Sequence, residues 1–156
     1  MVEYGVNLTS IVRKITNMSL TQNFYIIAEK DIPAISDYNE KVADGDQTEY
    51  SFDNPEETIQ YGDFLHGYLV HNGIAVNRNA MCSVLYPGER EELTQKLESS
   101  KNITDTQELS EMFPMIEGFF FGSGEYDEKF RENVDKVLEF FATLDPDDLV
   151  AYLADW

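Results

Sequence analysis

Three consecutive aromatic residues enclosed by glycines constrain the fold of this chain more than any other stretch. Residues 117–127 read EGFFFGSGEYD. Three adjacent phenylalanines favour burial, and the glycines after them give the backbone the freedom that a sharp turn needs. The acids that follow lie where a helix begins, because negative charge is stabilised at the positive end of the helix dipole. The stretch therefore predicts a buried strand, a tight turn and a helix packed on one another.

The helix after this turn has one apolar face. Its apolar residues recur at helical spacing, and they are Tyr126, Phe130, Val134, Val137, Leu138 and Phe141. Ser123 is placed to cap this helix, because its hydroxyl can accept a hydrogen bond from a first-turn N–H. The sequence therefore predicts an amphipathic helix from Glu125 to about Phe141.

The remaining apolar patterns predict a small sheet covered by helices. Strands are expected at residues 24–28, 81–86 and 117–121. Helices are expected at residues 7–17, 31–42, 54–71, 89–99, 105–113, 125–141 and 145–156. The 156 residues fit one domain, with no repeat or linker. We expect a single α+β domain over residues 1–156, with several amphipathic helices packed on the sheet and residues 1–17 as a peripheral N-terminal helix.

The helix predicted over residues 54–71 contains two glycines. Its start combines a capping asparagine, a proline and two acids, and Asn72-Gly73 is a typical end. Gly62 and Gly67 inside it would each weaken the helix by about 1 kcal/mol relative to alanine. Glycine at such a position can also allow another backbone to approach closely.

The chain is strongly acidic, with 30 acids, 11 bases and a net charge of −19. This charge disfavours direct binding to nucleic acid and to anionic membranes, since both require basic patches. It favours a partner with a basic surface or imitation of a polyanion, and it is also typical of an ordinary soluble acidic protein.

Two segments hold most of the excess charge. Residues 29–63 contain eleven acids and two lysines, and residues 125–156 contain ten acids and three bases. If these segments fold onto one side, the protein presents an anionic face. The residues we expect on that face are Asp44, Asp46, Glu56, Glu57, Asp127, Glu128, Glu132, Asp135 and Glu139.

Few residues suggest catalysis or metal binding. The single Cys82 excludes an intramolecular disulfide and a multi-cysteine zinc site, and we expect it to be a small core residue. Asp63 and His66 share a helix face, where they form either a structural bridge or, with Phe120, the wall of a pocket. We predict no catalytic residue, cofactor or metal. With no secretion signal or membrane-length apolar run, the expected location is the cytoplasm.

The stretch 117–128 is similar to the SGFFFGSTDYDE turn of a group of small bacteriophage and prophage proteins of unassigned function. A looser similarity extends over residues 24–141. Residues 65–69 match part of that group's YWRKANAIHKWF-type helix, and residues 81–86 resemble its cysteine-containing strand. The basic part of the helix motif is replaced by residues 58–61, which contain no base, and Asp63 replaces its asparagine. The resemblance implies a phage or mobile-element setting and supplies no mechanism.

Three functions remain open. The first is a protein that binds and inhibits a host or competing-element protein with a basic surface, as a counter-defence factor with a nucleic-acid-like anionic face. The second is an enzyme or small-molecule binder with a pocket near Asp63 and His66. The third is a virion or assembly component without a catalytic site. A homodimer is also left open, whereas direct nucleic-acid binding and membrane binding are not expected.

Overall fold

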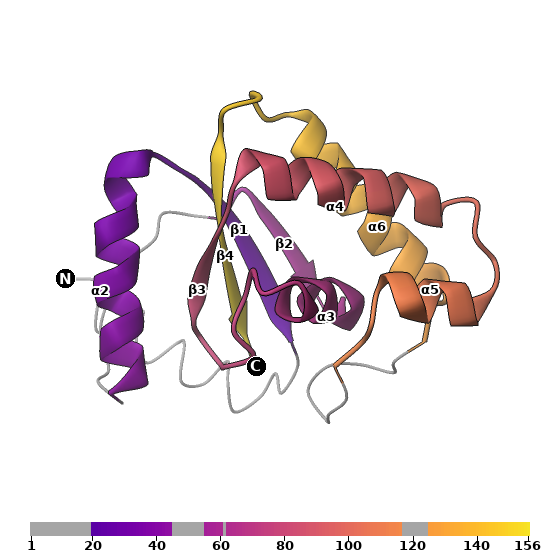
Figure 1. Ribbon diagram of the computed structural model, residues 1–156, viewed down its shortest axis with the longest axis horizontal. Helices are drawn as coiled ribbons and strands as arrows, with labels where there is room; N and C mark the ends of the chain where they lie inside the picture. The colour runs from indigo at the N-terminus through magenta and orange to yellow at the C-terminus, as the bar shows by residue number, and fades with distance from the viewer. Residues whose placement is uncertain (1–19, 45–54, 61, 117–124) are drawn as a thin grey trace.

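A four-stranded antiparallel sheet forms the centre of the structure (Figure 1). The computed structural model describes residues 20–44, 55–60, 62–116 and 125–156. The strands are β1 (Thr21–Ile27), β2 (Glu57–Gln60), β3 (Cys82–Leu85) and β4 (Leu149–Asp155). They lie in the order β2-β1-β4-β3, so the last strand of the chain is an inner strand.

Helices cover the two faces of the sheet unequally (Figure 1). One face packs against a helical layer made of α3 (Asp63–His71), α4 (Pro87–Ser100), α5 (Thr106–Met112) and α6 (Glu128–Ala142). The other face packs against α2 (Ile32–Ala43), which follows the short 3-10 turn η1 (Glu29–Asp31). This arrangement confirms the predicted α+β class, with a small sheet packed by helices.

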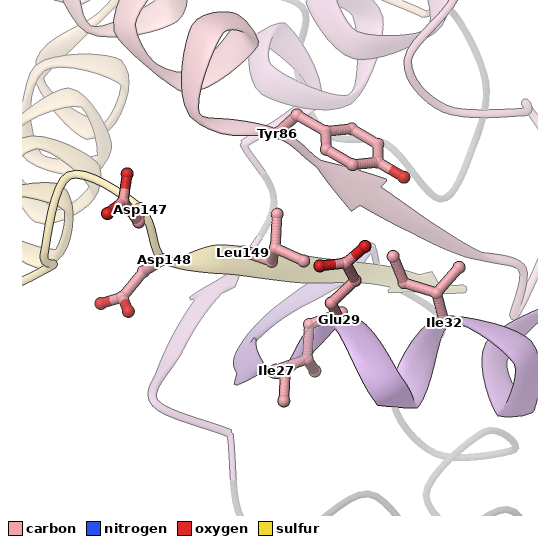
Figure 2. A pocket seen from close by; sticks show the side chains of 8 residues that line it. Ile27, Glu29, Ile32, Tyr86, Asp147, Asp148 and Leu149 are labelled. Atoms are coloured by element: carbon pink, nitrogen blue, oxygen red, sulfur yellow. The ribbon is translucent and has the colours of Figure 1, made fainter.

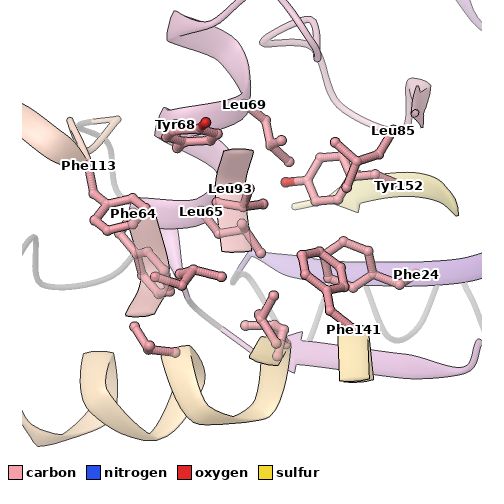
Figure 3. Close-up of a cluster of buried hydrophobic side chains, with 14 of the residues drawn as sticks. Phe24, Phe64, Leu65, Tyr68, Leu69, Leu85, Leu93, Phe113, Phe141 and Tyr152 are labelled. Atoms are coloured by element: carbon pink, nitrogen blue, oxygen red, sulfur yellow. The ribbon is translucent and has the colours of Figure 1, made fainter. Parts of the chain in front are cut away.

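The main core lies between the sheet and the helical layer (Figure 3). Phe24 of β1 and Tyr152 of β4 point into it, and both are almost fully buried. Phe64 of α3 contacts Phe113 and Phe130 in edge-to-face geometry, with ring centroids 5.6 and 4.7 Å away. Burial of these large rings provides most of the attraction between the layers, because buried area sets the hydrophobic gain.

The helix predicted over residues 145–156 is wrong, because residues 149–155 form strand β4. Along this strand Val150, Tyr152 and Ala154 face the helical layer, while Ala151 and Leu153 face α2. A strand buried on both faces is a continuous apolar run, and such a run cannot be distinguished from a helix by periodicity alone. The acidic residues before it form a turn, in which the Asp148 N–H donates to the Asp145 carbonyl oxygen at 3.1 Å.

The single helix predicted over residues 54–71 is also wrong in its first half. Residues 57–60 form the edge strand β2, and α3 begins only at Asp63. Pairing with β1 accounts for this difference, because Ile59 lies opposite Gln22 and is fully buried. The predicted end is confirmed, since Asn72 caps α3 and Gly73 has a φ of +72°.

Gly67 is the position where another backbone approaches α3, as the sequence suggested. A Cβ placed there would lie 1.7 Å from the Pro114 carbonyl oxygen. Glycine therefore allows the segment after α5 to pack directly on the helix. Gly62, in contrast, precedes α3 instead of lying inside it.

Other predicted elements are close to the observed ones. Helix α4 begins at Pro87, two residues earlier than expected, because proline is well suited to the first helical position. Helix α6 is capped by the Asp127 side chain, which accepts a hydrogen bond from the Phe130 N–H at 3.2 Å. The helix predicted at residues 7–17, the strand predicted at 117–121 and the predicted Ser123 cap lie outside the described residues.

Candidate functional site

Helix α6 carries a line of acidic side chains on its outer face. Glu128, Glu132, Asp135 and Glu139 are all exposed. Successive helical residues are rotated by about 100°, so these four fall within about 60° of arc, opposite the buried face. We call these four residues the acidic stripe.

Both arginines of the helical layer donate to backbone carbonyls. Arg131 donates to the carbonyl oxygens of Ser100 at 2.5 Å and Ile103 at 2.6 Å, at the end of α4. Arg90 is 8% exposed. It donates to three carbonyl oxygens of the loop before β4, those of Asp145, Pro146 and Asp148. These hydrogen bonds direct the two guanidinium groups toward the structure, while the stripe carboxylates remain at the surface.

Two lysines lie beside the acidic stripe. The Lys101 Nζ is 3.7 Å from carboxylate oxygens of both Glu98 and Asp135, and the Lys129 Nζ is 3.7 Å from Glu132. All five side chains are largely exposed. Each pair therefore contributes less than about 1 kcal/mol, and cationic groups of a partner can compete for the same carboxylates.

The acids predicted on one anionic face are only partly brought together. Exposed Glu56 and half-buried Glu57 lie at β2, which packs beside α6. Exposed Asp44 lies at the end of α2, on the opposite side of the sheet from α6 (Figure 1). Asp46 lies outside the described residues. The structure thus places Asp127, Glu56 and Glu57 near the stripe and Asp44 away from it.

His66 belongs to a buried chain of hydrogen bonds that joins α3 to the sheet. The His66 Nδ1 is 2.8 Å from the hydroxyl oxygen of Tyr152, and this hydroxyl donates to Gln22 Oε1 at 2.6 Å. The Gln22 Nε2 donates to the Gly62 carbonyl oxygen at 2.8 Å. His66, Gln22 and Tyr152 are at most 2% exposed. This chain ties β1, β4 and α3 together through His66, whereas the bridge considered from the sequence paired His66 with Asp63.

The direction of each hydrogen bond in this chain follows from the Gly62 carbonyl at its end. A carbonyl only accepts, so Gln22 must direct its NH2 group to Gly62 and its oxygen to Tyr152. The Tyr152 hydroxyl then uses its one hydrogen on Gln22 and accepts from the His66 Nδ1–H. The other ring nitrogen, Nε2, lies 3.1 Å from the Asn77 Oδ1, which is also an acceptor, so the protonated imidazolium satisfies the contacts of both ring nitrogens. Burial lowers the pKa of His66, and the contact with Asn77 opposes this effect.

Asp63 lies one helical turn before His66 and is 7% exposed. Burial raises the pKa of Asp63 from 3.8 to about 6. Hydrogen bonds from the backbone N–H groups of Asp63 and Phe64 oppose this rise, and the charge of Asp127 adds to it. The carboxylate is therefore held in the structure at an energetic cost whenever it is ionised.

Replacing Asp63 with asparagine should stabilise the protein in a pH-dependent way. The folded-state pKa is above the unfolded one, so the cost is absent below about pH 4, grows between about pH 4 and pH 6, and is complete above. Asp63→Asn should raise the free energy of unfolding by about 1–3 kcal/mol at about pH 8 and leave it nearly unchanged at about pH 4. Urea unfolding at both pH values measures this difference. Asp37→Asn, at an exposed site on α2, is the control, and a loss of stability for Asp63→Asn at the higher pH would contradict the argument.

Cys82 lies on the opposite face of the sheet from His66. It packs with Ile35 and Tyr38 of α2, and burial raises the pKa of its thiol to about 12. The Asn39 side chain accepts from the Cys82 N–H at 2.9 Å and donates to the Cys82 carbonyl at 2.7 Å, which satisfies the edge of β3. Cys82 is therefore a core residue, as predicted, and the sheet separates it from the imidazole.

The pocket predicted around Asp63 and His66 has one member, Phe120, outside the described residues. Asp63 and His66 are themselves buried in the helical layer. A surface hollow exists elsewhere, between the start of α2 and the start of α4, and neither residue lines it. Sequence reasoning did not identify that hollow, because its walls come from three separate segments of the chain.

Comparisons with protein-family models, curated proteins and solved structures found no match for this chain. Within residues 20–44, 55–60, 62–116 and 125–156, no three His, Cys, Asp or Glu side chains are grouped so that they could hold a metal ion. None of the helices in the described part of the chain is long and apolar enough to span a membrane.

Proposed function

We propose that this protein binds a partner protein with a basic surface through the acidic stripe of α6. In this proposal, binding covers a surface that the partner otherwise uses for nucleic acid. The observation that carries the proposal is the line of exposed carboxylates on α6, two of which pair with the exposed lysines Lys101 and Lys129. The stripe carboxylates are exposed along one line, whereas Arg90 and Arg131 are directed to backbone carbonyls.

The spacing of the acidic stripe supports imitation of a nucleic-acid strand. From Glu128 to Glu139 the helix rises about 16 Å, so the stripe has a carboxylate about every 5 Å. One strand of B-DNA has a phosphate about every 3.4 Å of helix axis. The stripe is thus a less dense anionic line, and the neighbouring acids of β2 can extend the charged surface.

The setting we propose for this function is a bacteriophage or another mobile element. The similarity of residues 117–128 to a group of phage and prophage proteins supports it. The target would then be a host protein or a protein of a competing element, in the cytoplasm of the host cell. Identification of the partner by affinity capture from a bacterial host is the first step of the test.

Charge reversal on α6 should slow binding to the identified partner. We expect Glu132→Lys combined with Glu139→Lys to reduce the association rate constant about tenfold and to change dissociation much less, because surface charge mainly steers encounter. Surface plasmon resonance at about 50 mM and about 300 mM salt measures both rates, and the wild-type affinity should fall steeply between them.

The matched control reverses two exposed acids of α2, Glu40→Lys and Asp44→Lys, which changes the net charge equally on the other side of the sheet. This variant should bind nearly as fast as the wild type. Nucleic acid should also compete with the protein for the partner. The proposal would be ruled out if the partner bound nucleic acid and this protein at the same time. It would also be ruled out if the affinity for the partner did not change with salt.

A further inference from the structure

A hollow lies where three segments of the chain, residues 27–32, 86 and 147–149, meet at one end of the sheet (Figure 2). Its volume is about 550 Å³. Its lining comes from the end of β1, the start of α2 with η1, the residue after β3 and the loop into β4. The lining residues are Ile27, Ala28, Glu29, Ile32, Tyr86, Asp147, Asp148 and Leu149.

The walls of the hollow combine an apolar floor with an acidic rim. Ile27, Ile32 and Leu149 provide aliphatic surface, and Figure 2 shows Leu149 beside the carboxylate of Glu29, with the ring of Tyr86 above them. Tyr86 is 47% exposed, which is unusual for a large ring at the end of a buried strand. Asp147 and Asp148 line the hollow from the loop before β4, and Figure 2 shows their carboxylates directed away from Leu149 and Glu29.

The loop that bears two of these carboxylates is held in place from behind. Arg90 donates to the Asp148 carbonyl at 2.5 Å and to the Asp145 carbonyl at 3.0 Å. The Asp145 N–H donates to the Asp148 carboxylate at 2.8 Å, which closes the turn. On the opposite wall the Ala28 N–H donates to the carboxylate of Asp31 at 2.9 Å. The hollow is therefore a preformed feature, which reduces the ordering cost of binding.

This combination of groups selects the charge and shape of an occupant. The Glu29 carboxylate in the hollow, together with the negative charge of the adjoining Asp147–Asp148 loop, repels an anion and attracts a cation. An aliphatic floor favours an extended methylene chain, and an exposed tyrosine ring favours a cation above its face, by about 0.5–1 kcal/mol at exposed sites. A planar guanidinium stacks on aromatic rings and pairs with carboxylates better than a strongly hydrated ammonium does.

We propose that this hollow binds an arginine side chain presented by the basic partner protein, an inference that rests on the function proposed above. The methylene groups of the arginine contact Ile32 and Leu149. Its guanidinium stacks on Tyr86 and forms an ion pair with Glu29. The hollow thus supplies local specificity, whereas the acidic stripe supplies long-range attraction.

The test uses the short peptide Ac-Gly-Arg-Gly-NH2 as a probe and needs no partner. Titration into the full-length ¹⁵N-labelled protein, followed by amide NMR spectra, should give saturable shifts for Glu29, Tyr86 and Leu149 in the millimolar range. The same peptide with citrulline, which is nearly isosteric and neutral, should give no saturable shifts there. Equal shifts with both peptides, or shifts confined to α6, would overturn the inference.

Variants then assign the contacts. Glu29→Gln should weaken the peptide affinity about two- to fivefold, as expected for a partly exposed ion pair. Tyr86→Ala should weaken it to a similar extent, and Tyr86→Phe should retain it because the ring face is kept. Glu128→Gln removes one charge from the acidic stripe and should leave the affinity unchanged. An unchanged affinity in both Glu29→Gln and Tyr86→Ala would disprove the site.

The peptide experiment separates this inference from the proposed function. Peptide binding at the hollow together with a salt-insensitive partner would leave the arginine site in place and reject the acidic stripe. If the peptide does not bind, and the double variant Glu132→Lys, Glu139→Lys associates slowly with the partner, the arginine site would be rejected and the acidic stripe retained.

Discussion

Gly67→Ala is expected to destabilise the protein by at least about 2 kcal/mol, although alanine is the better helix former. In an exposed helix the same change would stabilise by about 1 kcal/mol. Here the added Cβ would meet the carbonyl oxygen of Pro114 at 1.7 Å and its carbonyl carbon at 2.8 Å. Both atoms belong to the backbone, so no side-chain rotation can relieve the contact, and overpacking of this kind costs about 1–3 kcal/mol or more.

The matched control for this substitution is Gly88→Ala. Gly88 lies in the first turn of α4 and is exposed, with nothing within 4 Å of a Cβ built on it. The Gly88→Ala variant should be more stable than the wild type, by less than about 1 kcal/mol. Urea unfolding of both variants measures the contrast. A gain of stability for Gly67→Ala as well would mean that the segment at Pro114 does not pack on α3.

Phe24→Ala should cost about 3–5 kcal/mol of unfolding free energy, the range for a phenylalanine removed from a core. Phe24 is fully buried on β1. Its ring centroid is 5.5 Å from Tyr152, 5.6 Å from Phe140 and 6.2 Å from Phe141 (Figure 3). The side chain therefore joins the two inner strands to α6, and its removal leaves a cavity at the centre of the sheet–helix contact.

Ile26→Ala on the same strand provides the comparison. Ile26 is 44% exposed, so truncation removes much less buried apolar area and should cost about 1 kcal/mol or less. Thermal or urea unfolding of both variants tests the difference. Similar small losses for Phe24→Ala and Ile26→Ala would contradict the position of Phe24 in the core.

The sequence alone predicted the elements whose pattern is local. Helix α6 was found because its apolar residues recur on one face and its acids on the other, and this also located the four members of the acidic stripe. The end of α3 at Asn72-Gly73 was found because glycine adopts a positive φ without strain. The apolar segment predicted at 24–28 covers the second half of β1, the segment predicted at 81–86 contains β3, and Cys82 is buried as predicted.

Tertiary structure decided the elements that depend on distant partners. Residues 149–155 become a strand because β1 pairs with them on one side and β3 on the other. The helical layer buries one face of this strand and α2 buries the other. Residues 57–60 become an edge strand because β1 is available for pairing, which overrides a good local helix start. Local periodicity cannot contain this information, since paired residues such as Thr21 and Asp155 lie more than 120 positions apart in the chain.

The same division applies to the candidate sites. Exposure of the α6 carboxylates follows from the position of the apolar face on the same helix, so the sequence determined it. The hydrogen bonds of Arg90 and Arg131 to carbonyls, the chain from His66 through Tyr152 to Gln22, and the hollow beside Tyr86 each join segments far apart in sequence. Only the folded chain brings these groups together, because each contact depends on how separate strands and helices pack.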